Sequence, residues 1–177
     1  LEKIEEHGFR AYIVGGFVRD YILGNSTNDV DICTEATPKD IKEIFENITL
    51  PKTDYGAVRL DIKKHRFDIM TFRREISYYN NRKPMEVEYI KDLSSDLRRR
   101  DFTMNTLCMD KDGNVIDLLN GKEDIENRVI NTVGESISRF VEDPLRILRA
   151  VRFYTTLEFD LGEEVRLAII QTKGELS

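Results

Sequence analysis

The sequence predicts an α+β fold, in which a small mixed sheet flanked by helices is followed by an all-helical segment. Over residues 1–138, short apolar runs typical of strands alternate with amphipathic patterns typical of helices. From about Arg139 onward the pattern is helical only, and it is still helical in character near Ser177. We therefore expect a mixed unit over residues 1–138 and the beginning of a helical unit, which a longer protein would continue, over residues 139–177.

Composition and charge describe a globular chain whose positive charge is clustered. Hydrophobic residues make up 40% and charged residues 34% of the 177 positions, a balance that argues against intrinsic disorder. No apolar run is long enough to span a membrane, so we expect a cytoplasmic protein. The net charge of −6 argues against a surface covered by nucleic acid, but basic residues gather locally. The clusters are residues 63–66, 73–74 and 98–100, together with Arg146, Arg149 and Arg152.

The two cysteines, Cys33 and Cys108, lie in apolar, strand-like surroundings. We expect buried free thiols, because a zinc site needs more ligands than these two side chains supply. Free thiols also suit a reducing compartment.

A glycine pair between a strand and a helix is the first candidate site. We expect a strand over Ala11–Val14 and a helix over about Val18–Leu23, with Gly15 and Gly16 in the turn between them. Because glycine lacks a Cβ, backbone amides there can approach a phosphate, and a positive φ costs little. The positive end of the following helix would point at the same anion. Alone, such a pair is more often a plain tight turn, but acidic residues follow it closely.

Two aspartates lie on the next predicted strand, Asp29–Ile32. Side chains alternate between the faces of a strand, so Asp29 and Asp31 project together while Val30 faces apolar packing. Two carboxylates about 6–7 Å apart beside a phosphate cradle can hold a divalent metal for phosphoryl transfer. A solvated strand edge is the simpler interpretation of the aspartates taken alone.

Further elements follow in order along the chain. Thr37 and Pro38 begin a helix with an apolar stripe, because threonine is a favourable N-cap and proline suits the first turn. The segment Arg73–Pro84 is polar and without period, so we expect a loop there. The remaining predicted strands are Val58–Ile62, Phe67–Thr71 and Val115–Asp117, and the remaining predicted helices are about Leu97–Leu107, Lys122–Asn127 and Ser136–Thr156.

Four motifs in order resemble the class II tRNA nucleotidyltransferases. The first is Gly-Gly-x-Val-Arg-Asp-x-x-Leu-Gly at residues 15–24, followed by Asp-Val-Asp-Ile at residues 29–32. The others are Asp-Ile-Met-Thr-Phe-Arg at 68–73, Arg-Arg-Asp-Phe-Thr-Met-Asn at 99–105 and Glu-Asp-x-x-Arg…Arg-Ala-x-Arg-Phe at 142–153. That family contains CCA-adding enzymes and bacterial poly(A) polymerases. The resemblance implies a polymerase-β-like nucleotidyltransferase head over residues 1–138 and the start of a nucleotide-selecting helical neck over residues 139–177.

The resemblance also implies a metal-dependent catalytic centre. Asp29 and Asp31 would hold two Mg²⁺ ions, and Asp68 would lie near the attacking 3′-hydroxyl. Glutamate is common in the family at the position of Asp68, and either carboxylate can serve there. A salt-bridged strand residue is the alternative for Asp68.

Arginines and their neighbours supply the implied nucleotide site. Arg19 and Arg100 would grip the nucleotide, since a planar guanidinium binds phosphate in a bidentate way. Asp101 and Asn105 would share one helix face and brace the site or bind ribose, with local capping as the alternative.

A predicted helix carries the last motif. Asp143, Arg146, Arg149 and Arg152 recur every three residues along one side, whereas Ile147, Leu148, Val151 and Tyr154 would be buried on the other. By resemblance Asp143 and Arg146 select CTP or ATP without a nucleic-acid template. A solvated row of arginines is the alternative.

The expected function is therefore a CCA-adding enzyme that joins two CMP units and one AMP to the 3′ end of a tRNA. Close alternatives are a CC-adding enzyme, an A-adding enzyme or a bacterial poly(A) polymerase. A full-length segment Arg73–Pro84 argues against CC addition alone, because enzymes of that kind tend to lose a loop there. A catalytically silent RNA- or nucleotide-binding module is the alternative of another class, and the intact Asp29, Asp31 and Asp68 argue against it.

Overall fold

A computed structural model describes residues 1–46, 48–49, 56–63, 65–79, 83–172 and 174. Its centre is a mixed seven-stranded sheet in the order β3-β4-β5-β2-β1-β8-β9, in which β2 and β5 run parallel. Its strands are β1 (Ala11–Val14), β2 (Val30–Thr34), β3 (Ile48–Thr49), β4 (Ala57–Ile62), β5 (His65–Thr71), β8 (Cys108–Met109) and β9 (Val115–Ile116). The predicted α+β class with a mixed sheet is confirmed.

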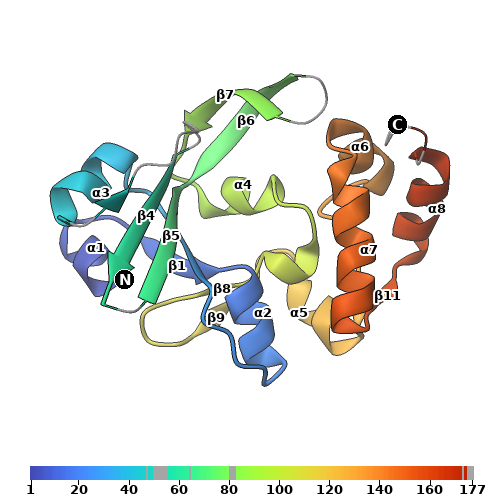
Figure 1. Cartoon of the computed structure of the whole chain (residues 1–177), viewed down its shortest axis with the longest axis horizontal. Coiled ribbons are helices and arrows are strands. Elements are labelled where there is room, and N and C mark those ends of the chain that lie inside the picture. The colour runs from blue at the N-terminus through green and yellow to red at the C-terminus, as the bar shows by residue number, and fades with distance from the viewer. Residues whose placement is uncertain (47, 50–55, 64, 80–82, 173, 175–177) are drawn as a thin grey trace.

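Helices surround this sheet and gather at one end of the molecule. Figure 1 shows α6, α7 and α8 together at the end opposite to α3. The helices are α1 (Glu2–Glu6), α2 (Gly16–Ile22), α3 (Pro38–Ile44), α4 (Leu93–Arg98), α5 (Gly121–Glu126), α6 (Ser136–Glu142), α7 (Leu145–Leu157) and α8 (Glu163–Thr172), with a 3₁₀ turn at Thr103–Asn105. The short strands β10 (Val129–Ile130) and β11 (Asp160–Leu161) pair in parallel.

The predicted opening of the fold is found as β1, α2 and β2, with β1 antiparallel to β2. The predicted start of α3 is also confirmed. Thr37 Oγ1 accepts a hydrogen bond from the amide of Asp40, and the Asp40 carboxylate accepts one from the amide of Thr37. This reciprocal capping satisfies amides that the first turn of a helix leaves without a partner.

The predicted loop at Arg73–Pro84 is wrong for the residues that the structure describes there. Residues Arg73–Tyr79 form β6 and pair with β7 (Lys83–Tyr89) as a hairpin, seen at the top of Figure 1. Its register shifts at Ser77. Such a bulge interrupts the two-residue alternation by which a strand is recognised in a sequence, which explains why the segment lacked a visible period. Residues 80–82 lie outside the described part.

The predicted helix Leu97–Leu107 is also wrong in its bounds. Helix α4 begins after Asp92, whose carboxylate accepts a hydrogen bond from the amide of Ser95, and ends at Arg98. Phe102 is extended, fully buried and paired with Thr132, so the helix cannot continue through it. Asp101 and Asn105 therefore do not share a helix face.

The predicted helix Ser136–Thr156 is two helices. Asp143 is extended, with φ −147° and ψ 98°, because the ring of Pro144 disfavours the helical conformation in the residue before it. Asp143 therefore lies between α6 and α7, and its carboxylate accepts a hydrogen bond from the amide of Leu145. The presence of β11 also corrects the expectation that the chain after Arg139 is helical only.

Helix α7 buries a different side from the predicted one. Ile147 is buried as expected, but Leu148, Val151 and Tyr154 are exposed. The buried residues are Arg146, Ile147, Ala150 and Phe153. They face a core that Phe102 and Met104 share with Phe140 and Phe159, so residues on both sides of the predicted boundary at 138/139 pack together. That boundary stays a prediction.

Cys33 and Cys108 are buried free thiols, as the sequence predicts. Burial raises the pKa of Cys33 well above its ordinary value, and neighbouring Cys108 raises it further. In the part of the chain that the structure describes, no helix is long and apolar enough to cross a membrane.

Candidate active site

One cavity of about 550 Å³ collects nearly every residue that the sequence singles out. It lies where the loops after β1 and before β2 meet the end of α4 and the side of α7. Asp68 alone among the predicted site residues does not line it. The predicted residues that do are Gly15, Gly16, Arg19, Asp29, Asp31, Arg100, Asp101, Asn105, Asp143, Arg146, Arg149 and Arg152.

The two glycines differ in what the fold requires of them. Gly15 has φ +82° and ψ −135°, a conformation that only glycine adopts readily. A Cβ at Gly15 would lie 3.8 Å from Arg100 Nη1 and 3.9 Å from Asp31 Oδ2, so these side chains converge on the turn. Gly16 begins α2, and a Cβ there would only touch Arg19 at ordinary contact distance.

The carboxylates of Asp29 and Asp31 both line the cavity. Asp31 lies in β2, which begins at Val30, one residue later than predicted. Asp29 is exposed and stands immediately before that strand. Val30 lies between them and packs against the core on the other side of the sheet. The predicted alternation along this segment therefore places both carboxylates at one cavity.

Asp68 occupies the strand beside Asp31 but has a partner of its own. The parallel register of β2 and β5 pairs Asp31 with Asp68. Arg59 on β4 donates from Nε to Asp68 Oδ1 at 2.8 Å and from Nη2 to Oδ2 at 3.1 Å. The alternative considered for Asp68, a salt-bridged strand residue, is therefore what the structure contains.

The environment of Asp31 opposes its negative charge. Burial raises the pKa of this carboxyl, Arg100 lowers it, and the carboxylates of Asp29 and Asp68 raise it again, so that the pKa stands above its ordinary value. A nearby cation would reverse this cost, because it favours the ionised form.

The carboxylates fit a magnesium ion that shares its coordination with a substrate. In the described residues, no group of three or more acidic, histidine or cysteine side chains is arranged to hold a metal ion by itself. Mg²⁺, however, commonly binds through one or two carboxylates together with phosphate oxygens and water. Asp29 and Asp31 supply such a pair at the cavity wall.

Arg19 is buried and held from three sides. It pairs with Asp20 at 2.8 Å and donates from Nη1 to Asn105 Oδ1 at 2.9 Å. Its guanidinium also lies over the ring of Phe153, 5.4 Å from the centroid. Asn105 therefore braces Arg19, although the two residues are far apart in the sequence.

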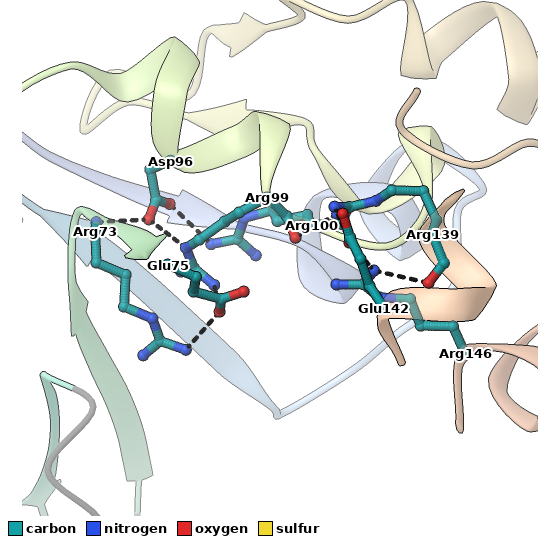
Figure 2. A network of polar contacts seen from close by, with 8 residues as sticks. All are labelled: Arg73, Glu75, Asp96, Arg99, Arg100, Arg139, Glu142 and Arg146. Atoms are coloured by element: carbon teal, nitrogen blue, oxygen red, sulfur yellow. Dashed lines mark hydrogen bonds and ion pairs between the residues drawn. The ribbon is translucent and has the colours of Figure 1, made fainter. Parts of the chain in front are cut away.

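Arg100 follows the end of α4 and is held by a buried carboxylate of that helix. Its Nη2 lies 3.5 Å from Asp96 Oδ2, and Asp96 also accepts hydrogen bonds from Arg99 Nε and from the amide of Arg73 (Figure 2). Burial lowers the pKa of Arg100, but Asp96, Cys33, Cys108 and Asp101 together outweigh it, and the pKa is raised. The guanidinium therefore stays charged at the cavity.

A second group of ion pairs joins α7 and α6 to the same region. Arg149 Nε lies 2.6 Å from Asp101 Oδ2. Arg146 donates from Nη1 to Glu142 Oε2 at 2.8 Å and to the carbonyl oxygen of Arg139 at 3.0 Å. Arg139 in turn donates to the backbone carbonyls at the end of α4, as Figure 2 shows. Arg146 and Arg149 are thus paired within the site, whereas Arg149 and Arg152 remain exposed, so the alternative of a solvated row holds only in part.

Several residues that line the cavity were not among the predicted site residues. Arg73, Glu75 and Arg99 line it, and their ion pairs connect the start of the hairpin with α4. Phe153 lines it too, with the guanidinium of Arg152 over its ring. The basic clusters at 73–74 and 98–100 were the available signal, but their contacts depend on the hairpin that the sequence did not predict.

Comparisons with known proteins agree with this geometry. A family model described as the poly(A) polymerase head domain matches residues 11–131. A CCA-adding enzyme of Staphylococcus aureus is 43% identical over 164 residues, which are 93% of this chain and 41% of that protein. This chain spans about two fifths of the length of the curated relatives it matches.

Solved structures are similar over nearly the whole chain. A CCA-adding enzyme of Bacillus stearothermophilus in complex with CTP has a TM-score of 0.91 and 40% identity, covering 99% of this chain and 42% of that one. A tRNA nucleotidyltransferase complexed with a primer tRNA and an incoming ATP analogue has a TM-score of 0.79 and 34% identity, covering 98% and 49%. The expected resemblance and the head fold are both confirmed.

Proposed function

Since this chain belongs to the poly(A) polymerase head-domain family, we propose that it is the catalytic head of a CCA-adding tRNA nucleotidyltransferase. The reaction joins two CMP units and one AMP, taken from CTP and ATP, to the 3′ end of a tRNA and releases pyrophosphate. The observation that carries this proposal is a single cavity in which two carboxylates face a cluster of arginines. The named relatives support the choice of substrates.

The carboxylates of the cavity serve the metal ion, and the arginines serve the nucleotide. Asp29 and Asp31 would hold Mg²⁺, which supplies charge stabilisation at the triphosphate and lowers the pKa of the attacking hydroxyl. Arg19 and Arg100 donate to phosphate and sugar oxygens from guanidinium groups that their partners hold in fixed orientations. The positive φ of Gly15 and the absence of a Cβ at Gly16 let the backbone approach the phosphates.

Asp68 has the role of orienting the attacking 3′-hydroxyl. It neighbours Asp31 across the parallel pair β2 and β5, which supports this role. Arg59 donates a hydrogen bond to each oxygen of its carboxylate. The arriving RNA strand, itself polyanionic, gives Arg59 another partner and leaves Asp68 available.

Nucleotide selection belongs to the start of α7. Asp143 offers acceptors and Arg146 offers donors at the cavity, a combination that can bond to the edge of a base. Arg149 and Arg152 lie further along the same helix and complete the binding of the nucleotide. We include in this proposal a head over residues 1–138, the start of a neck over residues 139–177, and a cytoplasmic location.

The test uses the full-length protein with a tRNA that lacks CCA and with each labelled nucleotide in turn. Addition of two C residues and one A supports the proposal. Products that stop after C, that gain only A, or that carry a long A tail identify a CC-adding enzyme, an A-adding enzyme or a poly(A) polymerase. A folded wild-type protein that binds CTP but adds nothing, under conditions in which a known CCA-adding enzyme is active, identifies a silent binding module.

A further inference from the structure

Asp96 is a buried carboxylate that does not line the cavity but contacts Arg99 and Arg100, which do. Its side chain is 1% exposed. Oδ1 accepts hydrogen bonds from Arg99 Nε at 2.9 Å and from the amide of Arg73 at 3.0 Å. Oδ2 faces Arg100 Nη2 at 3.5 Å and makes no hydrogen bond to any described residue. Within the described part of the chain, the contact of this second oxygen is therefore its ion pair with Arg100.

Arg100 stands between two carboxylates. Its Nη2 is directed toward Asp96, whereas its Nη1 reaches the turn at Gly15, where Asp31 Oδ2 also lies (Figure 2 shows the Asp96 side). No ion pair joins Arg100 to Asp31 in the described structure. Two of the guanidinium nitrogens, Nε and Nη2, have no hydrogen-bond partner among the described residues. Both of these nitrogens are buried, so Nη1, on the side of the turn at Gly15, is the one from which Arg100 can donate to a ligand in the cavity.

The position of Arg100 follows from competition between these two carboxylates. Electrostatic attraction is stronger where water is excluded, and the carboxylate of Asp96 is the more deeply buried of the two. Without a negative charge behind it, the guanidinium would be left with two carboxylates, Asp101 and Asp31. Asp101 is already paired with Arg149, which leaves Asp31 as the carboxylate that Arg100 would approach. An arginine paired with Asp31 would then occupy the carboxylate that a metal ion needs.

We propose that Asp96 is a positioning residue that holds Arg100 at the nucleotide and away from Asp31, so that Asp31 remains available to a divalent cation. The inference rests on the proposed function only in taking this cavity as the nucleotide–metal site. It assigns to Asp96 an effect on both ligands, although its side chain reaches neither of them.

A purely structural role for Asp96 makes a different prediction. Asp96 also connects α4 with the hairpin through the amide of Arg73, and loss of that contact would disturb the region generally. A general disturbance weakens every ligand, whichever member of the pair is replaced. In the proposed role, removal of the charge of Asp96 weakens cation binding, whereas removal of the charge of Arg100 strengthens it.

The experiment measures Mn²⁺ binding by electron paramagnetic resonance and CTP binding by calorimetry. It uses the full-length protein without tRNA, so that no chemistry takes place. We expect Asp96→Asn to weaken the binding of both Mn²⁺ and CTP by about tenfold or more, the range typical for loss of a residue that supports a site without touching the metal. Arg100→Gln should tighten Mn²⁺ and weaken CTP. Asp92→Asn is the matched control, because Asp92 caps the same helix without contacting Arg100 and asparagine is an equally good cap.

Each result decides the question. Mn²⁺ binding by Asp96→Asn equal to that of Asp92→Asn overturns the proposal, as does weaker Mn²⁺ binding by Arg100→Gln. If Asp96→Asn does not fold, Arg100→Gln is compared with Asp96→Asn/Arg100→Gln, which lacks both charges. Equal Mn²⁺ affinities support the proposal, while further weakening, or failure of this double variant to fold, overturns it. A wild-type protein that binds neither Mn²⁺ nor CTP counts instead against the proposed function.

Discussion

Arg149 Nε lies 2.6 Å from Asp101 Oδ2, and this ion pair ties α7 to the turn that follows α4. Both residues are proposed to serve the nucleotide, and each is the ion-pair partner of the other. The arginine side chain is 54% exposed and the aspartate 11%. A nucleotide can therefore draw Arg149 away from the pair more cheaply than it can draw Asp101.

The exposure of Arg149 predicts a functional rather than a structural effect for Arg149→Ala. Only the arginine side of the pair is exposed, and the Asp101 carboxylate keeps its hydrogen bond from the amide of Phe102, so the free energy of unfolding should fall by about 1 kcal/mol. KM for CTP and ATP should rise. Urea unfolding and steady-state kinetics check the two effects, with Arg166→Ala on the exposed side of α8 as the control. A large loss of stability at unchanged KM would make the pair a structural link only.

Replacement of the two cavity carboxylates should abolish nucleotide addition while the protein stays folded. For Asp29→Ala, Asp31→Ala or the double variant we expect kcat to fall by roughly 10²–10³ or more, because charge stabilisation at the transition state is lost. Asp61→Ala, which removes an exposed carboxylate of β4 outside the cavity, should leave kcat unchanged. Near-normal turnover by a folded double variant would remove both aspartates from the metal site.

The cost of burying Asp31 predicts that Asp31→Asn stabilises the metal-free protein. The pKa of this carboxyl is raised in the folded state, chiefly by burial. A raised pKa favours folding only while the group is protonated, so its contribution is lost as the pH rises through the folded pKa. At neutral pH the ionised carboxylate therefore destabilises the fold, and Asp31→Asn should raise the unfolding temperature.

Two further measurements test the sign of this effect. The rise in unfolding temperature caused by Asp31→Asn should become smaller as the pH is lowered through the folded pKa of Asp31, because the wild-type carboxyl is then itself neutral. Mg²⁺ with CTP should stabilise the wild-type protein more than Asp31→Asn. An unfolding temperature of Asp31→Asn below that of the wild type at neutral pH would contradict the prediction.

Local sequence patterns predicted those parts of the site that lie within one strand–turn–helix unit. The turn at Gly15, the pair Asp29 and Asp31, and the cap at Thr37 all follow from residue type and near spacing. Their geometry is set by a few adjacent residues, so period and propensity suffice.

Sequence patterns gave wrong predictions where contacts between residues far apart in the chain determine the backbone conformation. Phe102 leaves the helical conformation to enter a core shared with Phe153, and the period of the sequence carries no trace of that contact. The same core rotates α7 so that Arg146 is buried and Leu148 is exposed. The break at Asp143 was the exception, since Pro144 signals it locally. Each of these failures moved a proposed nucleotide-binding residue relative to its neighbours without removing it from the cavity.

Gly15 and Gly16 should respond differently to alanine. Gly15→Ala places a Cβ on a backbone with φ +82°, so we expect a loss of stability of about 1 kcal/mol or more. Gly16→Ala meets only ordinary contacts at the start of α2 and should leave the unfolding temperature within a few degrees of the wild type. If the turn cradles phosphate, however, Gly16→Ala should raise KM for all nucleotides. If KM of Gly16→Ala equals that of the wild type, the two glycines form a structural turn and do not bind phosphate.

Arg146 should determine which nucleotide is accepted. Its side chain is 8% exposed, lines the cavity and is held by Glu142 and by the carbonyl oxygen of Arg139, so its guanidinium is kept in one orientation. Base-edge hydrogen bonds differ between nucleotides, whereas contacts to the triphosphate do not. Arg146→Ala should therefore reduce discrimination against GTP and UTP, by the roughly 1–3 kcal/mol that a bidentate base contact contributes.

The matched comparison uses arginines assigned to phosphate and sugar. Arg19→Ala and Arg100→Ala should lower kcat/KM for all four nucleotides by one common factor. Glu142→Gln keeps the charge of Arg146 but removes its ion-pair partner, so it should show the pattern of Arg146→Ala in weaker form. Thermal unfolding of each variant separates these effects from loss of the buried packing around Arg146. If Arg146→Ala lowers all four values equally, then Arg146 binds phosphate or supports the fold, and the base is read elsewhere.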